Sequence, residues 1–472
     1  MKRIYINNFN LQNENWKIVD DSLLYRIIKS EREDQYNKIL SFDLDGTLIL
    51  SRTFLHPAQD ENDYIFYNDN VIDFLKKKES ENYKIIIFSN QRGVGTGKIS
   101  LTNIINRVDD IINKIGIPLE CYLALKNDKY RKPRVGMFNF VKQNNKCKFE
   151  EIIYVGDNAN RIYEENFKKS FFNHLKNVYQ KNNINIDIEN IKKSLIKDHS
   201  DTDLKFALNI NCKFYSTEEF FLNVKNNLTK QIEFVPSNLI KNVEESKDLQ
   251  ELIELCKKLF NEQPNRGNKP VDKLSIECDE KLSDKSHTNA IETINFLITK
   301  KMDGKTNPNQ VLIILIGAKG CGKTFFCNKY FPHFSIINTD KIVTKEKCEN
   351  IFKDFIYSGN NIIINSINLF AKNRLFFICE AKKINQKIKI YAIYFNYSKD
   401  LIIHLNTFKL LTNKTEIDDD NFKEPTNFFI RCVEKPEKNE YFDKIITLKD
   451  DDFIPSDFKN EEEKNLFFSY LH

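Results

Sequence analysis

Apolar and polar positions along this chain alternate in blocks that predict strands and helices in turn. Largely apolar runs occur at residues 38–42, 84–88, 121–125 and 152–155, and polar or charged side chains follow each of them. Between the runs lie segments whose apolar residues recur every three to four positions, as at 101–114. Unbroken apolar strands separated by helices are typical of a parallel sheet with helices on both faces, so we expect an α/β fold.

The first apolar run ends in two carboxylates one residue apart, Asp43 and Asp45. Residues i and i+2 of a strand point the same way, so both can serve one site at the strand's carboxyl end. Open α/β sheets bind their ligands at that end. One Asp there can attack phosphorus while a second acid protonates the leaving oxygen. The same Asp-Leu-Asp-Gly pattern also forms ordinary surface turns, and by itself it does not decide between the two.

Three later strand ends add further groups suited to phosphate chemistry. Ser89 follows the second run and can donate its hydroxyl to a phosphoryl oxygen, and Lys132 can neutralise charge that develops there. Asp157 follows the fourth run and offers an oxygen ligand for Mg²⁺ beside Asp43. Any one of these residues alone is more often a helix cap or a solvated charge. Their occurrence in order at successive strand ends predicts a single phosphoryl-transfer site.

These motifs resemble those of the haloacid dehalogenase-type phosphatases, and longer matches narrow the resemblance further. Residues 89–98, 130–137, 155–161 and 201–209 resemble the 3′-phosphatase domain of the polynucleotide kinase 3′-phosphatase family. The resemblance spans about 16–222 and implies a haloacid dehalogenase-like parallel-sheet domain. It departs from the family pattern at 164–197, which is longer and richer in Asn and Lys, and we interpret that segment as a surface insertion.

The resemblance also implies roles for the phosphatase residues. Asp43 would attack a 3′-phosphate to form an aspartyl-phosphate, and Asp45 would protonate the departing oxygen and then activate water. Mg²⁺ would be held by Asp43, the Asp45 carbonyl and Asp157. A phosphatase acting on small phosphorylated molecules remains an alternative at this point.

A second phosphate-binding pattern begins at the apolar run 311–316, which a glycine-rich loop follows. A strand, then G-x-x-x-x-G-K-T, then a helix is the context that a P-loop requires. The loop's N–H groups cradle phosphate, Lys323 reaches the β- and γ-phosphate oxygens, and Thr324 binds Mg²⁺. A nucleoside triphosphate is therefore the expected cofactor. The predicted nucleotide-binding residues are Gly317, Ala318, Lys319, Gly320, Cys321, Gly322, Lys323 and Thr324.

The chain after this loop resembles the kinase domain of the same family, so a P-loop kinase α/β domain is expected. Asp340 ends the run 334–339, where it can accept a proton from an attacking hydroxyl, and it matches the family's general base. Further apolar runs at 362–364 and 388–395 predict the next strands of this domain. The resemblance implies transfer of the γ-phosphate of ATP to a 5′-hydroxyl.

Three positions of this domain depart from the family pattern. Asn365 stands where the family usually has Asp, and Thr407 and Lys409 stand where it carries arginines over the phosphates. Lys lacks the planar fork of Arg, and Thr carries no charge. Other cations that could serve the lid are Lys414, Lys423 and Arg431. The kinase half is therefore either active, weakened or inactive, and an ATP-binding scaffold on DNA ends without turnover is a further alternative.

The expected domain order follows from these assignments. We expect an N-terminal extension with an edge strand near 16–19, then the phosphatase, a connection holding one helix, and the kinase, with limits at 1–33, 34–230, 231–308 and 309–472. Longer members of the family also carry an N-terminal phosphopeptide-binding module. Because only about forty residues precede Asp43, we expect no such module here.

Charge and cysteine content give limited information about the binding partners and the cellular compartment of the protein. The chain has 472 residues, and its 72 basic and 67 acidic side chains leave a net charge of +5, which neither demands nor excludes nucleic acid. Ten cysteines without C-x-x-C spacing fit a reducing intracellular compartment. No apolar run suggests a signal peptide or a membrane span.

The expected partners and location come from the resemblance. We expect a monomer that acts on DNA strand ends bearing a 3′-phosphate or a 5′-hydroxyl, with other repair proteins as candidate partners. The resemblance implies the nucleus, and a mitochondrion or another DNA-containing organelle remains an alternative.

Overall fold

The computed structural model describes residues 11–472 apart from 12, 55–57, 59, 146–148, 195, 225–231, 241–246, 262–307, 340–343, 414–422, 454 and 456–457. The chain divides into two compact units. The first comprises Met1–Pro236, Leu410–Ile417 and Glu462–His472, and the second comprises Ser237–Lys409 and Asp418–Glu461. The first unit therefore includes residues 462–472, which we had assigned to the second domain.

The first unit contains a seven-stranded sheet in the order β1-β2-β7-β6-β3-β8-β9. Its strands are β1 Lys17–Val19, β2 Leu23–Ile28, β3 Lys38–Phe42, β6 Tyr83–Asn90, β7 Leu119–Ala124, β8 Glu151–Gly156 and β9 Lys213–Ser216. The pairs from β7 to β9 are parallel, and β2 is antiparallel to both β1 and β7. The segment expected to be an N-terminal extension thus supplies two strands, and the expected edge strand near 16–19 is β1.

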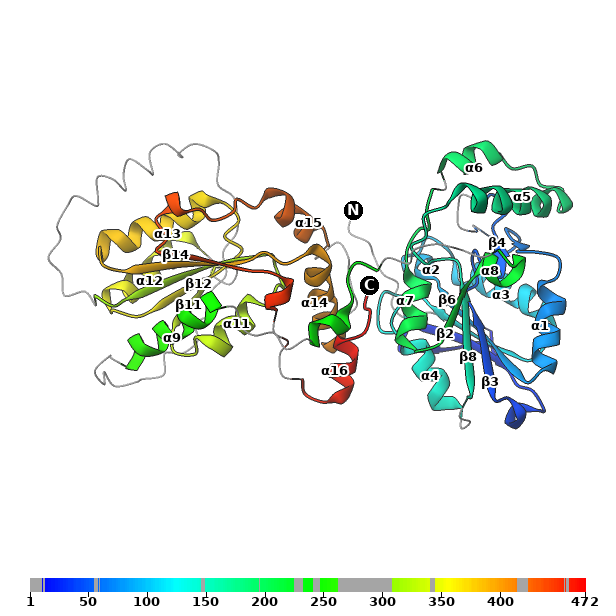
Figure 1. Ribbon diagram of the computed structural model, residues 1–472. Coiled ribbons are helices and arrows are strands. Elements are labelled where there is room, and N and C mark those ends of the chain that lie inside the picture. The colour runs from blue at the N-terminus through cyan, green and yellow to red at the C-terminus, as the bar shows by residue number, and fades with distance from the viewer. Residues whose placement is uncertain are drawn as a thin grey trace. The chain divides into compact units, whose positions relative to one another are not determined.

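Helices cover both faces of this sheet, as the continuous apolar strands predicted (Figure 1). One face carries α1 Val71–Ser80 and α3 Leu101–Ile115, and the other carries α4 Gly136–Asn144 and α7 Thr202–Asn209. The shorter elements are η1 Glu33–Gln35, α2 Arg92–Gly95, α8 Thr217–Leu222 and α16 Glu461–Phe467. The two covered faces make β3 a central, buried strand whose carboxyl end carries the Asp-Leu-Asp-Gly turn.

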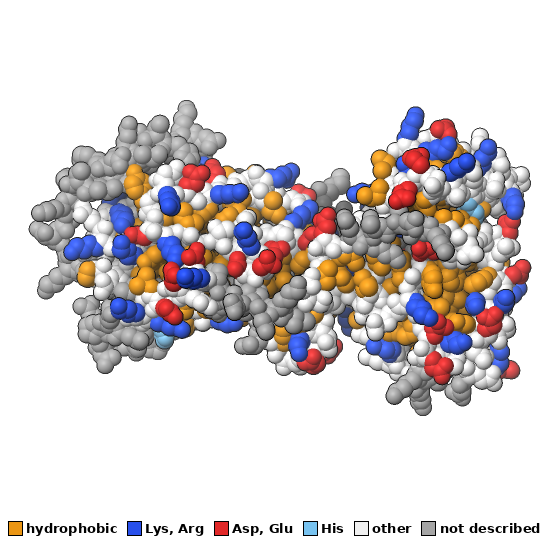
Figure 2. Space-filling view, in the orientation of Figure 1, with side chains coloured by type: hydrophobic (Ala, Val, Ile, Leu, Met, Phe, Trp, Pro, Cys, Tyr) orange, Lys and Arg blue, Asp and Glu red, His pale blue; other side chains and the backbone are white. Residues whose placement is uncertain are grey.

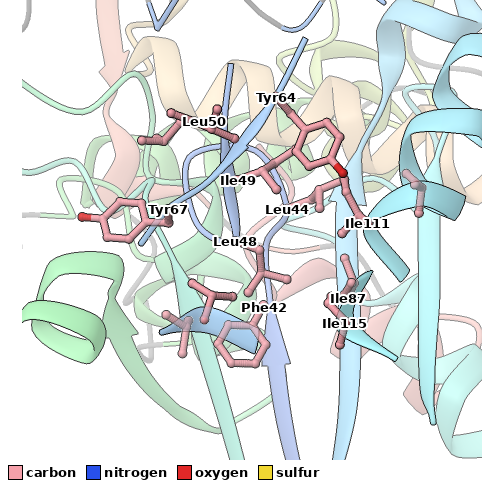
Figure 3. Packing of buried hydrophobic residues seen from close by; sticks show 14 of the residues in the cluster. Phe42, Leu44, Leu48, Ile49, Leu50, Tyr64, Tyr67, Ile87, Ile111 and Ile115 are labelled. Carbon is pink, nitrogen blue, oxygen red and sulfur yellow. The ribbon is translucent and has the colours of Figure 1, made fainter. Parts of the chain in front are cut away.

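A small hairpin leaves the sheet directly after that turn. Its strands are β4 Ile49–Leu50 and β5 Ile65–Phe66. In Figure 3, Leu48 lies close to the ring of Phe42 on β3, and Ile49 lies close to the ring of Tyr64. Burial of these side chains fixes the turn to the core, because moving the turn would expose apolar surface to water.

The segment 164–197, which we expect to be a surface insertion, is helical and partly buried. It forms α5 Glu165–Lys181 and α6 Ile188–Ser194, and α5 lies beside the β4–β5 hairpin (Figure 1). The Tyr179 hydroxyl donates a hydrogen bond to the Ser51 carbonyl oxygen, and the rings of Phe54 and Phe171 have centroids 6.2 Å apart. The buried residues recur with the period of a core-facing helix, which the surrounding Asn and Lys obscured. They are Phe167, Phe171, Phe172, Leu175, Val178 and Tyr179.

The second unit contains a five-stranded, fully parallel sheet in the order β11-β12-β10-β13-β14 (Figure 1). Its strands are β10 Val311–Ile316, β11 Ser335–Asn338, β12 Ile362–Asn365, β13 Lys389–Phe395 and β14 Lys444–Leu448. The helices are α9 Lys247–Asn261, α11 Lys323–Tyr330, α12 Lys345–Tyr357, α13 Ala371–Ile384, α14 Lys399–Thr412 and α15 Lys423–Cys432, with short turns η2 Pro236–Ile240, η4 Lys438–Glu440 and η5 Asp450–Asp452. The strand before the glycine-rich loop, β10, is central and fully buried.

The surfaces of both units are mixed in charge. On the face shown in Figure 2, the described Lys and Arg side chains are interspersed with Asp and Glu and do not form one continuous stripe. Among the described residues, every helix is too short or too polar to cross a bilayer.

Candidate active site

Asp43 stands at the carboxyl end of β3 and is only 6% exposed. Its backbone N–H donates to the Val155 carbonyl oxygen at 2.9 Å, which ties the end of β3 to β8. Gly46 then turns the chain with φ of +84°, and a Cβ there would lie 2.5 Å from an Asp157 carboxylate oxygen. Glycine is required at this turn because it permits the left-handed backbone and brings Asp157 close to the loop.

The Lys132 ammonium lies at the centre of the site and is completely enclosed. Its Nζ donates to Asp43 Oδ1 at 2.6 Å, to Asp203 Oδ1 at 2.8 Å and to the Tyr154 hydroxyl at 2.7 Å. Asn90 holds the Lys132 backbone, accepting from its N–H at 2.9 Å and donating to its carbonyl oxygen at 3.2 Å. The sequence prediction that Asp43 and Lys132 share a site therefore agrees with their geometry.

The two carboxylates that bind this ammonium form a candidate metal centre with a third, Asp157. Asp43, Asp157 and Asp203 each offer an oxygen, and these oxygens all lie within 4.8 Å of one another. Hard carboxylate oxygens at such spacing fit the ligand preference of Mg²⁺. Of these three, the sequence analysis named Asp43 and Asp157 as metal ligands and missed Asp203.

Asp203 belongs to the segment 201–209, whose resemblance to the family was recognised without assigning the residue a role. It lies in the first turn of α7, which approaches β8 so closely that a Cβ on Gly156 would lie 2.6 Å from Asp203 Cβ. Asp203 Oδ2 also accepts the Asn158 backbone N–H at 3.1 Å. An acid beside the first turn of a helix is a common sequence feature, and only the fold places this one against Lys132.

Asp45 lies in a more open part of the site than Asp43. Its side chain is 46% exposed, against 9% for that of Asp43. Gln91 Nε2 donates to Asp45 Oδ2 at 2.6 Å and to Ser89 Oγ at 2.9 Å, so Gln91 joins these two predicted residues. Arg107 places a guanidinium nitrogen 3.8 Å from Asp45 Oδ1. Neither Gln91 nor Arg107 was given a role from the sequence, although Gln91 lies in the segment 89–98 that resembles the family.

Burial governs the protonation of the acidic centre. Burial, followed by repulsion from Asp203, raises the pKa of Asp43 to about 7, although Lys132 acts in the opposite direction. Burial and the charges of Asp203 and Asp43 also raise the pKa of Asp157 well above its ordinary value. Burial alone would lower the pKa of Lys132, but the neighbouring carboxylates raise it. A divalent cation would relieve the repulsion between these carboxylates.

The glycine-rich loop of the second unit follows β10 and leads into α11. Gly322 adopts φ of +96° before the helix begins at Lys323. Lys323 Nζ donates to the Gly317 and Ala318 carbonyl oxygens, at 2.8 Å each, so its ammonium lies inside the loop. Strand, loop and helix thus have the order predicted for a P-loop.

The predicted metal-binding hydroxyl of this loop lies next to a residue that departs from the family pattern. Asn365 ends β12, and its Nδ2 donates to Thr324 Oγ1 at 3.0 Å. An amide donor therefore stands beside Thr324 where the family usually provides a carboxylate.

Helix α14 also contacts the loop, through a residue that the sequence analysis did not single out. Asn406 Nδ2 donates to the Lys319 carbonyl oxygen at 3.1 Å, and a Cβ on Gly320 would lie 2.0 Å from Asn406 Oδ1. The next residue, Thr407, is 1% exposed, so its side chain is enclosed by the protein.

The described candidate cations for the kinase lid lie on two helices, α14 and α15. Lys409 is exposed on α14, Lys423 begins α15, and Arg431 is exposed near the end of α15. The predicted general base Asp340 and the lid candidate Lys414 lie outside the described residues.

Comparison with known proteins agrees with this arrangement. The family model described as polynucleotide kinase 3 phosphatase matches residues 38–221, the part of the chain that carries the acidic centre. This chain belongs to that family. A protein of Acanthamoeba polyphaga mimivirus, named as a bifunctional polynucleotide phosphatase/kinase, is 28% identical over 463 residues, which cover 92% of this chain and 91% of the relative.

Two further relatives match different extents of the chain. The bifunctional polynucleotide phosphatase/kinase of Schizosaccharomyces pombe is 25% identical over 404 residues, covering 84% of this chain and 76% of the relative. The polynucleotide 3′-phosphatase of Arabidopsis thaliana is 25% identical over 217 residues, covering 42% of this chain and 26% of the relative. The matches to the mimivirus and Schizosaccharomyces pombe proteins extend over both units, so the family resemblance is not confined to the phosphatase half.

Proposed function

We propose that this protein processes the ends of DNA strands, removing 3′-phosphates in its first unit and phosphorylating 5′-hydroxyls with ATP in its second. The observation that carries the proposal is the buried Lys132 ammonium between Asp43 and Asp203, with Asp157 beside them. Membership of the family and the names of the relatives support the same pair of activities.

In the first unit Asp43 attacks phosphorus, and the bond from phosphorus to the 3′-oxygen breaks as the aspartyl-phosphate forms. Asp45 gives its proton to the departing 3′-oxygen, and it then takes a proton from the water that hydrolyses the intermediate. The exposure of Asp45 supports this role, because a carboxyl group that exchanges protons with water must be accessible to solvent. Lys132 stabilises the ionised nucleophile and the negative charge on the phosphoryl group.

Asp43, Asp157 and Asp203 would hold Mg²⁺ in this site, and the Asp45 carbonyl is a further candidate ligand. When bound, the metal ion neutralises charge on the phosphoryl oxygens. Ser89 is proposed to donate its hydroxyl to the same oxygens.

In the second unit residues 317–324 would bind the phosphates of ATP, with Lys323 turning from the loop carbonyls to the β- and γ-phosphate oxygens. Thr324 would bind Mg²⁺, and Asp340 would take the proton from the 5′-hydroxyl. Asn365 supports a weakened kinase as the second candidate, because it offers an amide donor to Thr324 instead of a carboxylate. We further propose a monomer acting in strand-break repair in the nucleus, with other repair proteins as candidate partners.

The test is an end-labelled DNA oligonucleotide that carries a 5′-hydroxyl and a 3′-phosphate, incubated with and without ATP. We expect loss of the 3′-phosphate without ATP and gain of a 5′-phosphate only with ATP. The variant Lys323→Ala should lose ATP binding and 5′-phosphorylation while keeping 3′-phosphatase activity.

Two outcomes would contradict this proposal. Faster hydrolysis of a nucleoside 3′-monophosphate than of the oligonucleotide would favour a small-molecule phosphatase. ATP binding without either reaction would favour a scaffold on DNA ends.

A further inference from the structure

The segment Phe467–His472 belongs to the first unit, although it follows the sequence of the second. Leu471 is completely buried and Phe467 is 2% exposed. Burial of two large apolar side chains favours a docked segment over one that moves freely in solvent.

Three side chains of the first unit hold the backbone of this segment at three consecutive residues. Asn209 Nδ2 donates to the Tyr470 carbonyl oxygen at 2.8 Å, and Asn209 Oδ1 accepts the Tyr470 N–H at 2.8 Å. Arg134 Nε donates to the Leu471 carbonyl oxygen at 3.0 Å. Lys205 Nζ donates to the His472 carbonyl oxygen at 2.9 Å.

These three side chains come from the two elements that carry the Lys132 and Asp203 groups of the acidic centre. Arg134 lies two residues after Lys132, and Lys205 and Asn209 lie on α7, which also carries Asp203. The turn that contains Lys132 and Arg134 therefore meets α7 in the active site, where Lys132 Nζ and Asp203 Oδ1 are 2.8 Å apart. They meet again at the segment Phe467–His472.

Asn209 joins the two elements directly as well. Its Nδ2 donates to the Pro133 carbonyl oxygen at 2.8 Å in addition to that of Tyr470. The amide thus connects the residue next to Lys132, the end of α7 and the docked segment. Arg134 and Lys205 are 5% and 8% exposed, and removing an acceptor from a buried cation is costly.

We propose that the segment Phe467–His472 is a clip that positions Lys132 against Asp203, so that residues beyond the kinase half complete the 3′-phosphatase site. Arg134, Lys205 and Asn209 are its positioning residues. The measurement of kcat rests on the proposed 3′-phosphatase function. The geometry of the clip rests on hydrogen bonds within the first unit.

The test uses the full chain with Leu471→Ala, which removes the buried anchor and keeps every backbone acceptor. We expect the kcat for 3′-phosphate removal to fall by about tenfold to a hundredfold with KM little changed. The reason is that a displaced Lys132 would stabilise the transition state less well, while substrate binding would be little affected. The conservative Leu471→Met should restore most of kcat. ATP-dependent 5′-phosphorylation is the internal control and should be unchanged.

A second variant and a second measurement keep the proposal falsifiable. Asn209→Ala should resemble Leu471→Ala, whereas Asn144→Ala, at the exposed end of α4, should leave kcat unchanged. Hydrogen exchange of residues 129–136 and 202–209 should accelerate in Leu471→Ala and Asn209→Ala without a matching change in β10.

Each result has a distinct meaning. An unchanged kcat in Leu471→Ala, or an equal loss of both activities with a lower melting temperature, would overturn the clip. If the unaltered protein removes no 3′-phosphate, the proposed function fails. Local acceleration of exchange would still support the clip in that case, and its absence would overturn it.

Discussion

The Lys132 ammonium lies 2.6 Å from the Asp43 carboxylate, and both side chains are almost completely buried. Removing two charges from water is costly, and such a pair persists when further bonds satisfy it, as Asp203 and Tyr154 do for this ammonium. A buried ion pair of this kind is weak evidence for stability, and its effect here is to oppose the rise in the pKa of Asp43 that burial causes.

Replacing Asp43 by Asn should lower the rate of 3′-phosphate release by about 10⁴-fold or more, because the attacking charge is lost while the shape is kept. End-labelled oligonucleotide assays measure this directly, with Asp73→Asn, an exposed residue of α1, as the matched control. Kinase activity should be unchanged, since its residues lie in the other unit. An equal fall in both activities would argue against two independent sites.

Replacing Asp203 by Asn should raise the Mg²⁺ concentration needed for half-maximal 3′-phosphatase activity, since the centre would lose one of three clustered carboxylates. We expect an increase of about tenfold or more, as for other changes at metal sites. Asp157→Asn should act in the same direction, and the exposed Asp187→Asn should not. A magnesium titration of the initial rate makes the comparison. If Asp203→Asn leaves the titration curve in place, Asp203 serves Lys132 alone.

The metal-free protein should lose stability as the pH rises from about 4 to 7. The pKa of Asp43 is raised from 3.8 to about 7 by burial, so between these values the folded state holds a proton that the unfolded state has released. Stability then falls with rising pH, by at most about 1.4 kcal/mol per pH unit for this one group.

Thermal melts in EDTA at pH 5, 6, 7 and 8 test this dependence. The variant Asp43→Asn should show a smaller loss over the same range, and Mg²⁺ should stabilise the unaltered protein most at pH 8. Parallel curves for the two proteins would show that Asp43 does not titrate in this window.

Replacing Asn365 by Asp should increase the rate of 5′-phosphorylation. The change substitutes a carboxylate for the amide that donates to Thr324 and adds negative charge where Mg²⁺ would bind. ATP binding should change less than turnover, since it rests mainly on the loop N–H groups and Lys323. Rates of 5′-phosphorylation and ATP titrations of both proteins separate the two effects. A slower variant would mean that the amide itself supports the reaction.

Arginine at position 407 is not expected to strengthen the kinase. The Thr407 side chain is 1% exposed, so a larger, charged side chain would overpack the core before it reached a phosphate. The resemblance noted from the sequence was only that the family carries an arginine at this position.

The order of apolar strands and polar strand ends in the sequence was sufficient to predict the parallel part of the first sheet and the parallel sheet of the second unit, and to place Asp43, Lys132 and Asp157 at one edge. Strands β2, β9 and β14 of the two sheets were missed, as were the hairpin strands β4 and β5. The apolar period of α5 was overlooked because of its many Asn and Lys residues, and the helix proved to be part of the core. Local sequence patterns predict which residues are buried, but not which other element packs against them.

The sequence by itself thus determined the α/β class, the P-loop and the acids at the strand ends, because these depend on periodicity and on residues adjacent in the chain. Only the tertiary structure decided that Asp203 joins the acidic centre, that Asn365 meets Thr324, and that Leu471 is buried in the first unit. These contacts join residues far apart in sequence, and no local pattern records them. They form only when the separate elements pack and bring distant side chains within hydrogen-bonding distance.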